Sequence, residues 1–284
     1  MRKPICLITG ATEGIGRATA IELARRGYTV VLAARDAAKA QAVAGDIEAT
    51  TGERDTGVIT ADLRSLADVR ALAEAFHLRY PRLDVLINNA GIFPGARRLT
   101  SDGFEAAYQV NYLSQFYLTH LMLGALKAAR QGRVINLSSS VHANGRFDPG
   151  NLQSEKRFSS FGTYANSKLL MLLFTIELAE RLKTTPVTAN AVHPGVVKTP
   201  MMLRAPGIFR VVAWLTLPFA LSPEQGAATS VYLATSPEVG GVSGKYFARS
   251  RQVDVKSAFN TPKNRELLWN LSLKSLGLAE APRA

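Results

Sequence analysis

Two kinds of segment alternate along the chain: short apolar runs bounded by turn residues, and longer stretches in which apolar residues recur every three to four positions. The short runs predict buried strands at Ile5–Thr9, Thr29–Ala34, Gly57–Ala61, Val85–Asn88, Arg133–Ser138, Val187–His193 and Gly244–Phe247. The longer stretches predict helices at Gly14–Arg26, Asp36–Thr50, Leu66–Tyr80, Asp102–Arg130, Phe161–Lys183 and Pro223–Thr235. This alternation predicts an α/β Rossmann fold, in which a doubly wound, seven-stranded parallel sheet has helices on both faces.

The domain organisation follows from what interrupts this alternation. No linker rich in Pro, Gly or Ser, low-complexity tract or internal repeat divides the 284 residues, so we expect a single domain over 1–284. Two regions depart from the pattern. The segment Met201–Leu221 is strongly apolar, and the tail after Arg249 contains a short predicted helix at Lys263–Leu278.

Charge and cysteine content narrow the class of protein. The formal net charge is +12, with basic residues concentrated at 198–223 and from Lys245 onward. Without an aromatic platform or recognition motif, we expect no nucleic-acid partner, and anionic cofactor phosphates or an anionic lipid surface fit the charge better. The single cysteine, Cys6, lies in the first strand, so no disulfide framework forms. With no signal-peptide core and no run of about 20 apolar residues, the sequence predicts a cytoplasmic protein.

A glycine-rich turn follows the first predicted strand. Its pattern, Gly10-x3-Gly14-x-Gly16, differs in spacing from the G-x-G-x-x-G fingerprint but serves the same purpose. Glycines allow the backbone to approach a phosphate closely, and the N-terminus of the next helix faces the anion. The turn predicts a dinucleotide site.

The end of the second strand indicates which dinucleotide binds. A carboxylate there would bind the adenosine ribose hydroxyls and repel a 2′-phosphate, but Ala34 is followed by Arg35. Arg35 suits a 2′-phosphate, and Lys39 adds charge, so we expect NADP(H) rather than NAD(H). The alternative is that Arg35 is a surface residue and Asp36 a helix N-cap.

A candidate catalytic pair lies in the fifth long helix. Tyr164 and Lys168 are four residues apart, on one face. A neighbouring ammonium lowers the pKa of a tyrosine from about 10, which makes it a usable acid or base. Such a pair is common by chance, but polar residues also follow the fourth and fifth strands, and Asn111 interrupts an apolar helix.

These residues together resemble a classical short-chain dehydrogenase/reductase. The motifs that carry the resemblance are Thr9-Gly10-x3-Gly14-Ile15-Gly16, Asp62-Leu63, Asn88-Asn89-Ala90-Gly91, Asn111, Ser139, Tyr164-x3-Lys168 and His193-Pro194-Gly195. The resemblance implies that Tyr164 is the general acid or base and that Ser139 binds the substrate oxygen. It also implies that Lys168 lowers the tyrosine pKa and holds the ribose, and that Asn111 holds a water.

The resemblance also implies a set of cofactor contacts. Asp62 would contact the adenine amine, Asn88 the ribose side and Thr199 the carboxamide. The remaining expected contacts are Gly10, Thr12, Glu13, Gly14, Ile15, Gly16, Leu63, Ala90, Gly91, Tyr164, Lys168, Pro194, Gly195 and Val197. Nothing in the sequence suggests a metal, since neither His142 nor His193 has metal-ligand neighbours.

An insertion points to one branch of the family. Ser139 and Tyr164 are 25 positions apart, more than is usual, which keeps Ser138 as the alternative to Ser139. The inserted Val141–Phe147 and Asn151–Lys156, with Ser243–Phe247, resemble the retinol dehydrogenase-like branch. That branch includes retinal reductases, WW-domain oxidoreductases and bacterial ketoreductases of aromatic polyketides. The chain itself shows neither the N-terminal anchor of many retinol dehydrogenases nor a WW domain.

The substrate side rests on a segment expected to act as a lid, over about 198–222, with a C-terminal extension over about 249–284. The apolar composition of 201–221 predicts a bulky lipophilic carbonyl or alcohol substrate. Two alternatives stay open: the segment packs on the core or a partner subunit, or its Arg204 and Arg210 rest it on an anionic membrane. The resemblance leaves a homodimer or homotetramer open. The competing function is a cofactor-binding sensor or scaffold without turnover, which would be expected to lack Tyr164 or Lys168.

Overall fold

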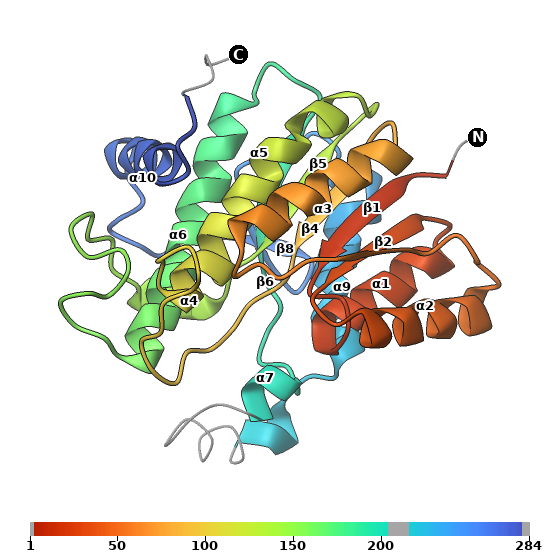
Figure 1. Cartoon of the computed structure of the whole chain (residues 1–284), viewed down its shortest axis with the longest axis horizontal. Helices are drawn as coiled ribbons and strands as arrows, with labels where there is room; N and C mark the ends of the chain where they lie inside the picture. Colours follow the sequence, from red (N-terminus) through yellow and green to blue (C-terminus); the bar gives the residue numbers. More distant parts are fainter. Residues whose placement is uncertain (1–2, 204–215, 280–284) are drawn as a thin grey trace.

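An eight-stranded sheet forms the centre of the molecule (Figure 1). The computed structural model describes residues 3–203 and 216–279. The strands are β1 (Ile5–Thr9), β2 (Thr29–Ala34), β3 (Gly57–Thr60), β4 (Val85–Asn88), β5 (Arg133–Leu137), β6 (Thr188–His193), β7 (Tyr246–Ala248) and β8 (Arg251–Val253). Their order is β3-β2-β1-β4-β5-β6-β7-β8, and β1 to β7 are parallel, as expected. The strand order reverses between β1 and β4, which is where sheets of this kind bind ligands.

The central strands are rich in apolar residues because helices cover both faces of the sheet, whereas the edge strand β8 is exposed. All five residues of β1 are buried, and Cys6 and Ile8 point to the opposite face from Ile5 and Leu7. On the Cys6 side lie α1 (Gly14–Arg25), α2 (Ala37–Thr51) and α9 (Pro223–Thr235). The Leu7 side carries α3 (Leu66–Arg79), α5 (Ser114–Lys127) and α6 (Ser160–Arg181). The expected doubly wound arrangement is confirmed.

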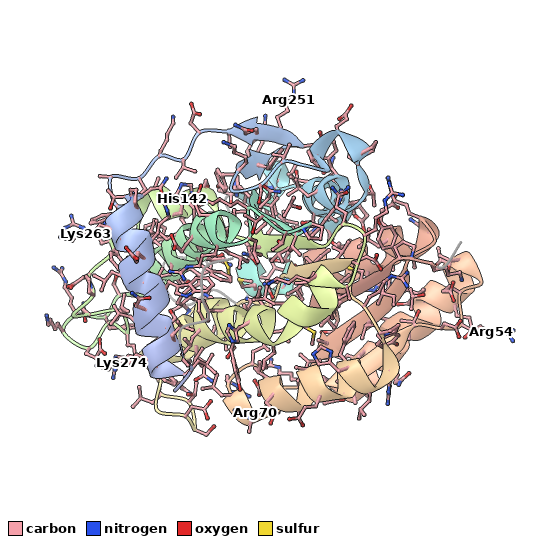
Figure 2. The ribbon with its side chains drawn as sticks, turned by 90° about the horizontal axis from the view of Figure 1, so that it is seen from above. Arg54, Arg70, His142, Arg251, Lys263 and Lys274 are labelled. Carbon is pink, nitrogen blue, oxygen red and sulfur yellow. The ribbon has the colours of Figure 1, made fainter. Side chains whose placement is uncertain are left out.

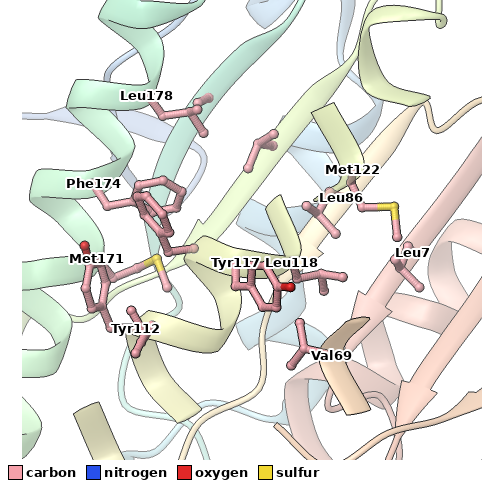
Figure 3. Packing of buried hydrophobic residues seen from close by; sticks show 14 of the residues in the cluster. Leu7, Val69, Leu86, Tyr112, Tyr117, Leu118, Met122, Met171, Phe174 and Leu178 are labelled. Carbon is pink, nitrogen blue, oxygen red and sulfur yellow. The ribbon is translucent and has the colours of Figure 1, made fainter. Parts of the chain in front are cut away.

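The core on the Leu7 side is rich in aromatic and sulfur-containing side chains (Figure 3). Phe174 and Met171 of α6 pack beside Tyr112, while Leu7 and Leu86 reach the same layer from the sheet. The Phe174 ring lies 5.0 Å from that of Phe116. This packing holds α6 against the sheet and so sets the position of the residues that α6 carries.

One expected helix is wrong in its start and in its regularity. The helix predicted at Asp102–Arg130 begins at α4 (Ala106–Tyr108), passes through a π-helical turn (Gln109–Leu113) and continues as α5. Asp102 instead accepts a hydrogen bond from the Leu66 backbone at the start of α3, and buried Glu105 caps α4 by accepting from the Tyr108 N–H. The π turn frees the Val110 carbonyl, which accepts from the Gln115 side chain.

The last strand was not expected. β8 pairs antiparallel with β7 through a two-residue turn in which Arg249 and Ser250 both have positive φ, 51° and 57°. Such turns usually contain Gly or Asn, so this sequence carries no signal for the hairpin. The extension expected at 249–284 is described as far as residue 279 and consists of β8 and α10 (Pro262–Ser275).

The terminal helix α10 lies beside α6 (Figure 1). Leu268, Trp269 and Leu273 are buried against the α5 and α6 side, while Lys263 and Lys274 point outward (Figure 2). The helix therefore covers part of α6. Within residues 3–203 and 216–279, no helix is both long and apolar enough to cross a membrane.

Two expectations fall partly outside the described residues. The lid over 198–222 and the membrane contact through 201–221 both include residues 204–215. The structure describes α7 (Pro200–Leu203) in this segment and the base of the segment, where Val197 bridges Leu221 and the Leu221 N–H donates to the Val196 carbonyl at 2.8 Å.

Candidate active site

A cleft opens at the carboxyl ends of β1 to β5, at the reversal of strand order. It is closed on its other sides by α6 and by the segment after β6. Fifteen of the expected residues line it: Gly10, Thr12, Glu13, Gly14, Ile15, Gly16, Arg35, Asp62, Leu63, Ala90, Gly91, Tyr164, Lys168, Pro194 and Thr199. The tertiary structure thus gathers side chains from positions 10 to 199 into one cavity.

The glycine turn between β1 and α1 is built for close approach. Gly10 has φ 65°, and a Cβ on it would lie 2.8 Å from the Ala90 Cα. A Cβ on Gly16 would overlap the Gly10 carbonyl oxygen. Asn89 holds the turn, because its amide donates to the carbonyls of Thr9 at 2.8 Å and Gly10 at 3.0 Å. The N-terminus of α1 therefore faces the cleft, ready for an anion.

The end of the cleft reached by β2 and β3 is predominantly cationic. Arg35 and Asp62 line it as expected, and Arg64 lines it as well. The Arg64 Nε lies 3.1 and 3.0 Å from the two carboxylate oxygens of Asp62. These hydrogen bonds are the main cause that holds the pKa of Asp62 below its ordinary value. Sequence reasoning missed Arg64, although its place just after Asp62-Leu63 at the end of a strand was a usable signal.

Tyr164 and Lys168 lie together on α6, whose first turn is capped by the Ser159 side chain. The Lys168 ammonium is buried and donates to the Leu137 carbonyl at the end of β5, at 2.9 Å. The Phe93 ring packs on that of Tyr164, with 5.1 Å between the centroids. The end of β5 thus fixes Lys168, and the Phe93 ring packs on Tyr164.

Burial governs the protonation of this pair. It raises the pKa of Tyr164 to about 12 and lowers the pKa of Lys168 to about 8. The direction is opposite to the lowering that we expected from the ammonium, because the cause that acts on Tyr164 here is the removal of the phenolate from water. The phenol is therefore a proton donor at neutral pH.

The two candidate serines differ in their surroundings. The buried Ser138 hydroxyl donates to the Lys168 backbone carbonyl at 2.8 Å, which ties the end of β5 to α6. The Ser139 hydroxyl accepts a long hydrogen bond, 3.4 Å, from the Val141 N–H, and its own proton has no acceptor among the described residues. Ser138 lines the cleft, but its hydroxyl is already engaged. Both serines therefore stay candidates: Ser138 lines the cleft with an engaged hydroxyl, and Ser139, whose proton has no acceptor among the described residues, lies outside the cleft lining.

Asn111 lies in the π turn, fully buried, outside the lining of the cleft. Its side chain accepts from the Ile92 N–H at 2.7 Å and donates to the Ile92 carbonyl and to Ser167. A Cβ on Gly91 would contact both the Asn111 amide oxygen and the Lys168 ammonium. Gly91 therefore lies between the side chains of Asn111 and Lys168, and Asn111 holds the chain segment that follows β4.

Four expected cofactor residues are not brought to the cleft wall. The buried Asn88 amide donates to Thr119 at 2.9 Å and to Asn136 at 2.7 Å, so it joins β4 to α5 and β5. The exposed Lys39 ammonium lies 3.7 Å from Asp36, which caps α2. Gly195 and Val197 form the turn and bridge after β6. The side chain that does line the cleft beside Asn88 is that of Asn89.

The two histidines near the serine turn have structural partners. His142 donates from Nδ1 to the Ser139 carbonyl at 2.7 Å, and the His193 Nδ1 accepts from the Ser140 N–H at 3.2 Å. Burial lowers the pKa of both. In the part of the chain that the structure describes, no group of three His, Cys, Asp or Glu residues is placed to hold a metal ion.

Comparison with known proteins gives relatives along the whole chain. Residues 4–206 match the family model described as short chain dehydrogenase. Retinol dehydrogenase 12 of Mus musculus is 43% identical over 275 residues, which cover 96% of this chain and 86% of that protein.

Solved structures share the architecture. An uncharacterized protein from Mycobacterium paratuberculosis superposes with a TM-score of 0.78 at 32% identity and covers 98% of this chain and 95% of that one. A short chain dehydrogenase from Shigella flexneri 2a, complexed with NADP, has a TM-score of 0.72 at 26% identity and covers 88% of this chain and 98% of that one.

Proposed function

Since the chain belongs to the short-chain dehydrogenase/reductase family, in its retinol dehydrogenase-like branch, we propose that it interconverts a carbonyl and an alcohol on a bulky lipophilic substrate with NADP(H). The observation that carries this proposal is that the glycine turn and the Tyr164–Lys168 pair line one cleft. The N-terminus of α1 would hold the phosphates of a dinucleotide in that cleft, and Tyr164 and Lys168 would hold its reactive end.

The choice of NADP(H) is supported by charge. β2 ends without a carboxylate, and Arg35 and Arg64 line the end of the cleft reached by β2 and β3. This end, called the adenosine end below, is where the adenosine of the cofactor would bind. A 2′-phosphate carries about two negative charges at neutral pH, which two guanidiniums suit. The structural relative from Shigella flexneri 2a, which is complexed with NADP, supports the same choice.

The chemistry divides between cofactor and protein. A bound nicotinamide supplies or accepts the hydride. In reduction, the Tyr164 hydroxyl donates its proton to the substrate's carbonyl oxygen while the Ser139 hydroxyl holds that oxygen in place. The Lys168 ammonium, held by the Leu137 carbonyl, stabilises the phenolate that forms. Because burial keeps Tyr164 protonated, with a pKa of about 12, the resting site is prepared for reduction.

The lipophilic substrate class is supported at the reactive end of the cleft. The Phe93 ring packs on Tyr164, and Ile92 and Met201 line the adjoining cavity walls. Apolar walls beside a single reactive phenol favour a substrate held by its hydrocarbon surface rather than by polar groups.

The test is turnover of NADPH and of NADH with retinal, steroid ketones, aromatic polyketide ketones and simple aryl ketones. We expect turnover with NADPH and the bulky apolar carbonyls. Equal use of NADH would contradict the cofactor assignment, and activity confined to small polar carbonyls would contradict the substrate class. Tight NADPH binding without turnover of any compound would favour the sensor or scaffold instead.

A further inference from the structure

Arg64 sits where two cavities meet. The cofactor cleft and a neighbouring groove share Arg35, Asp62, Arg64 and Ile92. Arg98 lines the groove but not the cofactor cleft, so it can serve as a control for Arg64. We propose that Arg64 is a specificity-determining residue for the cofactor, because it offsets the Asp62 carboxylate and so gives the adenosine end the positive charge that a 2′-phosphate needs. This inference rests on the proposed use of NADP(H).

The charge balance at this end of the cleft depends on Arg64. The loops after β2 and β3 bring three charged side chains to the cleft, Arg35, Asp62 and Arg64, while the other charged residues of its lining are Glu13 in the glycine turn and Lys168 on α6. The charges of Arg35 and Asp62 alone would sum to zero, and the charges of the nearby ion pair between Lys39 and Asp36 also sum to zero. With Arg64, the three side chains that follow β2 and β3 carry one net positive charge. Without it, a phosphate would meet an unpaired carboxylate.

The geometry shows how the carboxylate is offset. The Arg64 fork spans both oxygens of Asp62, and the Arg64 backbone N–H donates to the same carboxylate at 2.9 Å. The Asp62 backbone N–H donates to Asp68 at 3.0 Å, which fixes the loop at the start of α3. The Arg64 Nη1 has no hydrogen-bond partner among residues 3–203 and 216–279, so it is available to an anion.

Solvent screening limits how much the loss of Arg64 can change the affinity for NADPH. The side chains of Arg64 and Asp62 are 52% and 28% exposed, so each pairwise interaction is screened. We expect Arg64→Ala to raise the Kd of NADPH about tenfold and to change the Kd of NADH less than about twofold. Arg64→Lys keeps the charge but loses the fork, so NADPH should weaken no more than about threefold.

The decisive test is a double variant. If Arg64 acts by offsetting Asp62, then Asp62→Asn in the Arg64→Ala background restores NADPH affinity at least about threefold, because the exposed carboxylate is gone. Asp62→Asn alone and Arg98→Ala are the matched controls, and Arg98→Ala should leave both cofactors within about twofold. Cofactor fluorescence gives each Kd without a substrate. Competition by 2′,5′-ADP against 5′-AMP assigns the change to the phosphate.

The outcomes distinguish a failure of the role proposed for Arg64 from a failure of the proposed use of NADP(H). If the unmodified protein binds NADH as tightly as NADPH, the proposed cofactor is wrong. If NADPH is preferred but Arg64→Ala weakens both cofactors equally, or if Asp62→Asn restores nothing, the role of Arg64 is overturned while the proposed function stands. Thermal unfolding of every variant shows whether the loop is intact.

Discussion

The Lys168 ammonium lies 5.6 Å from the centre of the Tyr164 ring and 2.9 Å from the Leu137 carbonyl oxygen. Their spacing on α6 places the two side chains on one face of the helix, while the hydrogen bond to the end of β5 fixes the position of the ammonium. The lysine is therefore held by the sheet rather than by the phenol. This arrangement keeps a positive charge beside the tyrosine without a direct hydrogen bond to it.

Replacement of the phenol tests the proton donor. Tyr164→Phe should lower kcat by a factor of about 10² to 10⁴, because the variant cannot protonate the carbonyl oxygen. NADPH affinity should change little, since the ring and its contact with Phe93 remain. Steady-state kinetics and cofactor fluorescence measure the two effects. Tyr232→Phe, on the outer surface of α9, is the matched control, and comparable turnover in Tyr164→Phe would refute the mechanism.

The pH dependence of reduction should follow Lys168. Burial lowers its pKa to about 8, so the ammonium is charged below that pH and neutral above it. Tyr164, with a pKa of about 12, stays protonated across this range and does not limit reduction. We expect kcat/KM for NADPH, which reports the free enzyme, to fall as pH rises through about 8. Lys168→Arg keeps its charge and should lose this decline; a flat profile in the unmodified enzyme would contradict the assignment.

The two serines can be separated by paired substitutions. Ser139→Ala should lower kcat about tenfold or more while stability is kept, because only the hydroxyl for the substrate oxygen is lost. Ser138→Ala should instead cost about 1 kcal/mol of unfolding free energy, because the Lys168 carbonyl loses its donor. Kinetics and urea denaturation of both variants decide the matter, and the reverse pattern would assign the substrate oxygen to Ser138.

Arg35, at the end of β2, should also control cofactor choice. Arg35→Asp places a carboxylate at the end of β2, where it repels a 2′-phosphate and can bind ribose hydroxyls. The ratio of kcat/KM for NADPH to that for NADH should fall by about tenfold or more. If the ratio does not move, Arg35 is a surface residue that takes no part in cofactor selection.

The terminal helix should contribute strongly to stability through one side chain. The Trp269 ring lies 4.9 Å from that of Phe116 and 4.4 Å from the Arg181 guanidinium, which pairs with Glu177. Trp269→Ala should lower the free energy of unfolding by about 3 to 5 kcal/mol. Its neighbour Leu267 is partly exposed, and Leu267→Ala should cost less than about 1 kcal/mol. Equal effects in urea denaturation would mean that α10 is not anchored by Trp269.

Much of this molecule was decided by local sequence. The apolar runs set β1 to β7, because strands covered on both faces are rich in apolar residues. The glycine turn and the Tyr164–Lys168 pair were equally readable, since a tight turn needs glycine and a helix aligns residues four apart. These features depend on neighbours in the chain, so no tertiary contact was needed to predict them.

The tertiary structure decided what depends on distant neighbours. Parallel pairing of β2 with β3 brings Arg35 to the side of Asp62 and Arg64, and packing of α5 on β4 turns Asn88 inward while Asn89 faces the cleft. Burial set the protonation of Tyr164 and Lys168, because removal of a charge from water depends on everything packed around it and not on spacing. The β7–β8 hairpin and the π turn likewise follow from packing, since neither has a sequence signal of its own.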